Sequence, residues 1–274
     1  MKIHINHLKR FIKDDIDPDE LSEKFMQLGH ENTYQKGIFD LEITPNRGDC
    51  LSIKGILREL NNLYNVNTSF KTFDGKIEEL NFNFINNSEN DCPVINFLHI
   101  EVDKIPSQYK SYLQSYFDEL NINKNNFFTD ISNYVSYEQG NPTHCYDLEK
   151  VGDQLVLEKP KDKVSFKTLT GKNIDLCQSD LVFTNGKNVL NLAGVMGGES
   201  TSCDNDTKKV LIECAFFKPK SLIGKSIKYD LNSEAAYKFE RGVDSLMLEN
   251  TLRRFISIVE DHAKITNLSL YQKI

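Results

Sequence analysis

The stretch from Leu190 to Asp244 constrains the fold and the site of this chain more than any other. It opens with the Gly-rich run L-N-L-A-G-V-M-G-G-E (190–199), whose glycines let the backbone approach a ligand where a side chain would block it. Glu213 follows in the apolar run L-I-E-C-A-F-F, where an ionised carboxylate needs a partner. A loop of small residues, L-N-S-E-A-A, comes next. Together these segments predict the walls of a pocket for a small polar ligand.

Composition indicates a globular protein. The 274 residues are 39% hydrophobic and 27% charged, which allows one large domain or two modest ones. No apolar run approaches the roughly 18 residues of a membrane span, and the N-terminus lacks the apolar stretch of a signal peptide. The six cysteines are widely spaced and form no C-x-x-C pair, which is typical of reduced thiols. We therefore expect a cytoplasmic protein without a membrane partner.

The net charge of −7 is unfavourable for non-specific binding to nucleic acid, because neutralising phosphates supplies most of that affinity. A solvated surface of mixed charge is the simpler interpretation of this composition. Local basic clusters nevertheless predict where a cationic surface would lie. These are Lys218, Lys220, Lys225, Lys228, Arg253 and Arg254.

The pattern of apolar residues predicts a small N-terminal α+β unit over residues 1–70. Asp17 and Pro18 mark the start of a helix with an acidic first turn, and Gly29 is its expected stop. A second helix, expected to be capped by Asp49, carries an apolar stripe. The expected elements are a strand at 2–5, the helix from Pro18, a strand at 39–43 and a helix at 50–64.

Residues 71–91 form a polar connector, with a strand expected at 80–84, and residues 92–274 form a second, mixed α/β domain. The fold class is therefore α+β. Short strands separated by turns dominate the second domain, and a helix closes it. The expected strands are 94–102, 154–159, 165–169, 181–184, 189–193 and 210–213, and the expected helices are 106–120 and 245–263.

Three polar residues outside the glycine run are candidates for chemistry. His144 follows a Gly-Asn-Pro turn and has the pKa range of a general base, although a structural histidine in a turn is the alternative. Glu213 is able to recognise a hydroxyl or an amine, or else to pair with Lys or Arg. Ser233 has the position of a helix N-cap. The glycine run lacks the spacing of a dinucleotide or P-loop motif, and no metal site is predicted.

Five motifs occur in a fixed order along the chain. They are T-P-N-R-G-D-C-L-S (44–52), S-N-Y-V…G-N-P-T-H-C-Y-D-L (132–148), L-A-G-V-M-G-G-E (192–199), I-E-C-A-F-F-K-P (212–219) and S-E-A-A-Y-K-F-E-R-G-V-D (233–244). In this order they resemble the bacterial phenylalanyl-tRNA synthetase β subunit, as does the opening M-K-I-H-I-N-H-L-K-R-F-I. The resemblance covers nearly the whole chain.

This resemblance implies an editing domain that hydrolyses tyrosine wrongly esterified to phenylalanine tRNA, with no cofactor for the editing step. A separate site that binds the hydroxyl destroys a product that the synthetic site cannot fully reject. The family has Thr where this chain has Ser233, and L-H-A-F-D where it has T-H-C-Y-D. By likeness, the catalytic residues are His144, Asn133 and Ser233, and the substrate-binding residues are Glu213, Gly194, Gly197 and Ala235.

The resemblance also implies missing parts. Only residues 31–37 connect the opening segment to the T-P-N-R motif, which leaves no room for the oligonucleotide-binding fold of the family, and the C-terminal modules are absent. Our first hypothesis is an editing module acting on the aminoacylated 3′ end of phenylalanine tRNA. It would act with the synthetase α subunit, with a separate C-terminal β fragment, or in trans. The alternatives are a non-catalytic tRNA-binding or assembly part of a split synthetase, and a paralogue with another ligand.

Overall fold

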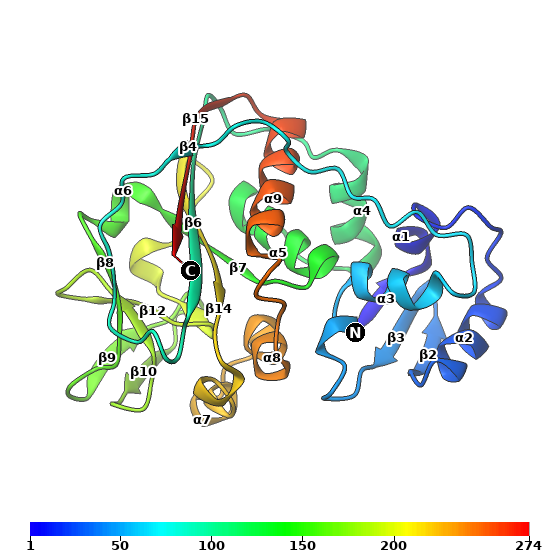
Figure 1. The fold of residues 1–274 in the computed structure, drawn as a ribbon, viewed down its shortest axis with the longest axis horizontal. Coiled ribbons are helices and arrows are strands. Elements are labelled where there is room, and N and C mark those ends of the chain that lie inside the picture. The colour runs from blue at the N-terminus through cyan, green and yellow to red at the C-terminus, as the bar shows by residue number, and fades with distance from the viewer. Residues whose placement is uncertain (274) are drawn as a thin grey trace.

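The computed structural model describes residues 1–273 and shows a small N-terminal unit beside a larger body built on two five-stranded sheets (Figure 1). Helices and strands are mixed throughout, which confirms the predicted α+β class. Over the described range, every helix is too short or too polar to cross a membrane.

The N-terminal unit is a three-stranded antiparallel sheet in the order β1-β3-β2, packed against helices. As predicted, the Asp17 carboxylate caps the helix that begins at Pro18, accepting hydrogen bonds from the backbone N–H groups of residues 19 and 20 at 3.0 Å. Strand β2 lies in the segment predicted to be only a connection. The bounds are β1 (Lys2–His4), α1 (Ile5–Lys9), α2 (Pro18–Gln27), β2 (Glu31–Gln35), β3 (Ile38–Glu42), η1 (Gly48–Cys50) and α3 (Ile53–Leu60).

Helix α3 begins later than expected because its cap is Ser52 rather than Asp49. The Ser52 hydroxyl accepts a hydrogen bond from the backbone N–H of Gly55 at 3.0 Å. The Asp49 carboxylate is instead bound by the guanidinium groups of Arg47 and Arg58. An aspartate that pairs with two arginines is not free to cap a helix.

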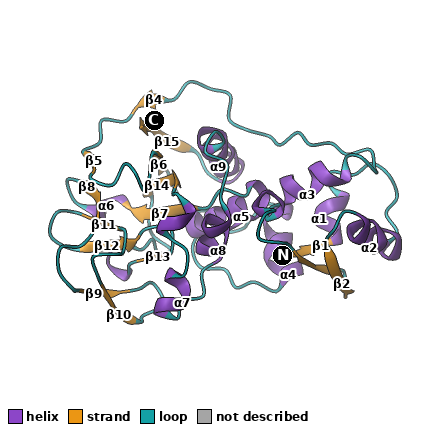
Figure 2. Ribbon diagram, turned by 60° about the horizontal axis from the view of Figure 1, so that its bottom comes forward, coloured by secondary structure: helices purple, strands orange, loops and turns teal. Residues whose placement is uncertain are grey.

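The larger body holds one sheet in the order β4-β15-β6-β14-β7, a second in the order β13-β12-β11-β8-β5, and a hairpin of β9 and β10 (Figure 2). Its strands are β4 (Glu78–Glu79), β5 (Phe84–Asn86), β6 (Val94–Val102), β7 (Thr143–Asp147), β8 (Leu155–Glu158), β9 (Val164–Lys167), β10 (Asn173–Leu176), β11 (Val182–Thr184), β12 (Val189–Leu192), β13 (Met196–Gly197), β14 (Lys209–Phe216) and β15 (Ile265–Lys273). Its helices are α4 (Ser111–Leu120), α5 (Phe127–Gln139), α6 (Leu148–Val151), η2 (Glu199–Thr201), η3 (Pro219–Ser221), α7 (Lys225–Tyr229), α8 (Glu234–Arg241) and α9 (Leu248–His262).

The central strands of the first sheet are buried on both faces. Side chains alternate along a strand, so Leu98 and Ile212 join the core formed with α5 and α9. Phe97 and Leu211, their neighbours in sequence, join the core shared with the second sheet. Glu213 follows Leu211 by two residues and therefore points towards the second sheet.

Three further segments differ from the sequence-based expectation. Residues 71–91, expected mainly as a linker with a strand at 80–84, instead supply β4 and β5, which pair with β15 and β8. The chain does not close with a helix, because β15 follows α9 and pairs antiparallel with β6. Helix α4 starts at Ser111 rather than at residue 106.

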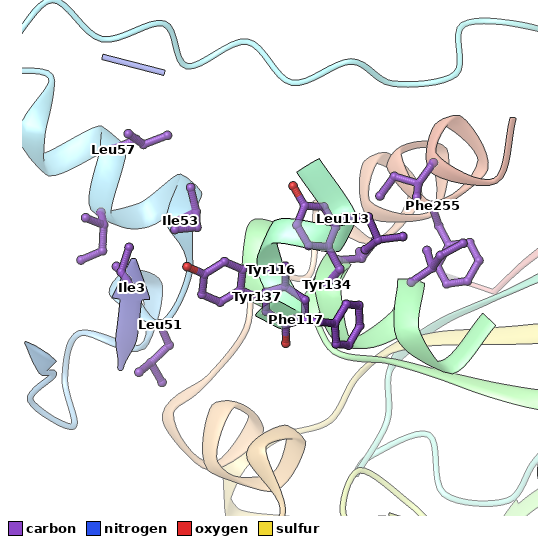
Figure 3. Packing of buried hydrophobic residues seen from close by; sticks show 14 of the residues in the cluster. Ile3, Leu51, Ile53, Leu57, Leu113, Tyr116, Phe117, Tyr134, Tyr137 and Phe255 are labelled. Carbon is purple, nitrogen blue, oxygen red and sulfur yellow. The ribbon is translucent and has the colours of Figure 1, made fainter. Parts of the chain in front are cut away.

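The N-terminal unit and the larger body share one hydrophobic core. Figure 3 shows Ile3 and Leu57 of the N-terminal unit in the same cluster as Tyr116 and Tyr137 of the larger body, with Phe255 of α9 further along. The predicted boundary near residue 70 stays a prediction, and the core that crosses it fixes the two parts against each other.

Candidate functional site

A cavity of about 60 Å³ lies where β7 and β14 of the first sheet face β12 of the second. The start of helix α8 and the glycine run after β12 close its other sides. The lining residues are Pro142, Thr143, His144, Asn191, Gly194, Val195, Met196, Gly197, Glu213, Ala235 and Phe239.

Five of the seven residues implied by the family resemblance line this cavity, and they come from four separate segments of the chain: His144, Gly194, Gly197, Glu213 and Ala235. Ser233 lies directly behind the wall. Its hydroxyl donates a hydrogen bond to the Val195 carbonyl oxygen at 2.6 Å and accepts one from the Ala236 backbone N–H at 3.1 Å, so it is also the N-cap of α8.

Asn133 does not line this cavity, and the prediction that placed it there is wrong. It belongs to helix α5, where successive side chains point about 100° apart. Helix α5 contacts β7 through Ser132, whose hydroxyl donates to the Thr143 carbonyl oxygen at 2.7 Å. The side chain of Asn133 is therefore turned by about 100° from that of Ser132, and it is exposed.

His144 and Glu213 face the same cavity because they are directly paired across β7 and β14. The glycines allow the opposite wall to come close. A Cβ atom on Gly197 would lie 2.3 Å from His144 Cε1, so any side chain there would displace the imidazole. Gly194 has a φ of +67°, and a Cβ atom there would lie 2.6 Å from Cδ1 of Leu222.

Glu213 is held by a hydroxyl rather than by a cation. The Tyr146 hydroxyl donates to Glu213 Oε2 at 2.8 Å, and Asn191 Nδ2 donates to the same hydroxyl oxygen at 2.8 Å. Within residues 1–273 no Lys or Arg forms an ion pair with this carboxyl group. Burial raises the pKa of Glu213 to about 8, although the Tyr146 hydrogen bond acts in the opposite direction. The carboxyl group is therefore largely uncharged at neutral pH.

His144 is neutral at the same pH, because burial lowers the pKa of its imidazole to about 4. Its ring meets the Tyr146 ring edge-on, with the two centroids 4.4 Å apart. A neutral imidazole has one nitrogen that donates and one that accepts, so it is able to orient a water molecule. The site therefore combines an uncharged acid with an uncharged imidazole in a cavity without a fixed charge.

The cavity lies within a segment that matches a known protein family. The family model described as the B3/4 domain matches residues 94–264, which include every residue that lines the cavity. The chain belongs to the B3/4 domain family.

Curated relatives of this B3/4 protein are named phenylalanine–tRNA ligase beta subunits. The subunit from Fusobacterium nucleatum is 31% identical over 233 residues, which cover 82% of this chain and 29% of the relative. That from Bartonella quintana is 32% identical over 221 residues, 78% of this chain and 27% of the relative. These matches confirm the resemblance seen in the motifs, and the chain spans less than a third of the length of these relatives.

Among solved structures, an N-terminal fragment of the phenylalanyl-tRNA synthetase beta-subunit from Pyrococcus horikoshii is similar with a TM-score of 0.45 and 14% identity. The match covers 97% of this chain and 74% of that chain.

Two polar residues of the B3/4 site were missed by the sequence reasoning. Tyr146 is fully buried and Asn191 is 3% exposed. Each carries a signal that could have been used. Asn191 interrupts the apolar run V-L-N-L, just as Glu213 interrupts its own strand, and Tyr146 adds a hydroxyl where the family pattern L-H-A-F-D has Phe.

Most of the predicted cationic surface is neutralised by ion pairs. Lys225 and Lys228 both pair with the buried Asp180, at 2.7 and 3.2 Å. Arg253 forms an ion pair with Glu249, one helical turn away, and the buried Arg254 forms an ion pair with Glu138. Lys218 and Lys220 are the members of the predicted set without an ion pair in the described part of the chain.

One group of side chains has the spacing of metal ligands. Atoms of Asp49, Cys50 and Glu59 lie within 4.8 Å of one another. The Arg47 Nη2 atom contacts all three of them, at 3.0, 2.9 and 2.8 Å respectively. A guanidinium group already supplies the positive charge that these groups require.

Proposed function

We propose that this B3/4 protein is an editing hydrolase that removes tyrosine wrongly esterified to phenylalanine tRNA. The observation that carries the proposal is the direct pairing of His144 with Glu213 over one cavity whose glycine wall allows backbone to approach a ligand. This arrangement supplies a group that recognises a hydroxyl next to a group that orients water.

In the proposed reaction the uncharged Glu213 carboxyl hydrogen-bonds the phenol of the tyrosyl group. A site that binds a hydroxyl in this way disfavours phenylalanine, because its own polar group would stay unpaired. Water oriented by His144 attacks the ester carbonyl carbon, and the bond from that carbon to the ribose oxygen breaks. The products are free tyrosine and a tRNA whose ribose oxygen has regained a proton.

Access to the site requires movement of its rim. The cavity of about 60 Å³ is smaller than the roughly 150 Å³ of an engineered cavity that binds benzene. Met196 lines the cavity, is only partly buried, and belongs to a residue type that adapts its shape easily. We therefore expect Met196 to swing outward when a phenol ring is bound.

The test is deacylation of phenylalanine tRNA charged with tyrosine and, separately, with phenylalanine. Glu213→Ala should reduce the preference for the tyrosyl ester, because it removes the group that reads the hydroxyl. His144→Ala should slow both reactions, by about 10² to 10⁴ if the histidine acts in proton transfer. Glu42→Ala, which removes an exposed carboxyl from β3, is the matched control and should change neither. Equal loss for both esters in Glu213→Ala would contradict the assigned roles.

The narrow cavity also favours a second candidate, a non-catalytic tRNA-binding or assembly part of a phenylalanine–tRNA ligase. Its partner would be the synthetase α subunit or a separate C-terminal β fragment. Under this proposal the wild-type chain leaves both esters intact yet stabilises such a partner. Co-purification together with the deacylation assay separates the two candidates.

A further inference from the structure

Asn191 has an unused hydrogen-bond acceptor at the site. Its amide nitrogen donates to Tyr146, but its amide oxygen, Oδ1, is buried and has no hydrogen-bond partner among the described residues. Asn191 is 3% exposed and lines the cavity. Buried polar atoms in folded proteins nearly always have a partner, so an orphaned acceptor on a residue that lines a cavity points to a donor inside that cavity, either a water molecule or a ligand.

The direction of the hydrogen bonds fixes what Glu213 presents to the cavity. Because the Tyr146 oxygen accepts from Asn191, its single hydrogen is free to go to Glu213 Oε2. That oxygen of the carboxyl group is therefore an acceptor, and the proton of the uncharged acid belongs on Oε1. The site then offers one donor, Glu213 Oε1–H, and one acceptor, Asn191 Oδ1.

We propose that Asn191 is a second specificity-determining residue, whose amide oxygen accepts a hydrogen bond from the same ligand hydroxyl that Glu213 binds. The proposal rests on the editing function and deepens it. A hydroxyl both donates and accepts, so it satisfies both groups at once. An ammonium group only donates, a carboxylate only accepts, and a hydrocarbon does neither. The ligand class is thus an aminoacyl ester whose side chain ends in an uncharged hydroxyl.

Tyr146 is a positioning residue in this arrangement. It is fully buried between the two groups and fixes both of them through one oxygen atom. If the Tyr146 hydroxyl is removed, the acceptor of Asn191 and the donor of Glu213 remain, but no hydrogen bond holds the two side chains in a fixed relative position. Tyr146→Phe should therefore weaken discrimination less than Asn191→Leu, which removes the acceptor itself at similar side-chain size.

The experiment is a calorimetric titration of the full chain with two hydrolysis-resistant probes, adenosine carrying tyrosine or phenylalanine through a 3′-amide. The wild type should bind the tyrosyl probe more tightly. In Asn191→Leu that preference should fall about tenfold, the effect of one neutral hydrogen bond, while the phenylalanyl probe binds at least as well as before. Tyr146→Phe should show a smaller fall.

Several outcomes would overturn the proposal. They are an unchanged preference in Asn191→Leu, an equal loss of affinity for both probes, and a wild type that binds neither probe. If Asn191→Leu does not fold, Asn191→Ala, which also removes the amide oxygen, decides in its place. Deacylation assays on the same proteins separate this proposal from the editing function. A wild type that prefers the tyrosyl probe but hydrolyses neither ester refutes editing alone, whereas active editing with unchanged selectivity in Asn191→Leu refutes only the role of Asn191.

Discussion

Glu213 should make the stability of this protein depend on pH in a direction set by its burial. The pKa of this carboxyl group rises from 4.5 to about 8 on folding. A difference of one in pKa corresponds to about 1.4 kcal/mol. Through Glu213, the free energy of unfolding at low pH should therefore exceed that above about pH 8 by roughly 4 to 5 kcal/mol. Because the folded state binds the proton more tightly, this contribution is fully present below pH 4.5 and is lost as the pH rises through about 8.

Glu213→Gln isolates this contribution, because glutamine has almost the same shape and stays uncharged at every pH. The assay is urea unfolding of the wild type and the variant at several values between about pH 5 and pH 8.5. The free energy of unfolding of the wild type minus that of the variant should fall by several kcal/mol as the pH rises. His144 acts in the opposite direction, since its lowered pKa costs stability as the pH falls, but it is present in both proteins and cancels.

Glu42→Gln is the control, since it makes the same substitution at an exposed carboxyl group. It should leave the pH dependence as it is in the wild type. A difference between the wild type and Glu213→Gln that stays flat, or that grows with pH, would mean that Glu213 is ionised in the folded protein. The recognition of a hydroxyl by an uncharged acid would then be wrong.

Three further predictions follow from the packing and the charges. Gly197→Ala should displace the His144 imidazole, costing about 1 to 3 kcal/mol and most of the hydrolysis rate, and unchanged deacylation would refute the close contact. Arg254→Met should destabilise the protein by about 3 to 5 kcal/mol in urea unfolding, because it leaves Glu138 buried and unpaired, and adding Glu138→Gln should recover much of the loss. Electrophoretic titration at two salt concentrations should show weak tRNA binding by the chain alone with a shallow salt dependence, because most of its clustered cations are already paired, and tight, steeply salt-dependent binding would contradict this.

The elements that the sequence predicted well are those determined by local signals. Helix α2 has its capping aspartate, its proline and its apolar stripe within one short segment, and the structure contains all three. Strands β4, β5 and β15 carry no comparable local signal. They exist because backbone groups far away in the sequence complete their hydrogen bonds, as β6 does for β15. Such pairing depends on the positions of distant parts of the chain, and a short window of sequence holds no information about those positions.

The same distinction explains the site. The glycines and Glu213 were found because each is unusual in its local sequence. The glycines leave a run of backbone without side chains, and Glu213 places an ionisable group in an apolar strand. Asn133 was misplaced because it was assigned by family likeness alone, which does not say on which face of its helix the residue lies in this chain. Asn191 is unusual in the same way as Glu213, but its partner Tyr146 lies 45 positions away on another sheet. An unexplained polar residue in a buried strand is therefore best treated as one half of a contact, and the most informative question is which other strand supplies the second half.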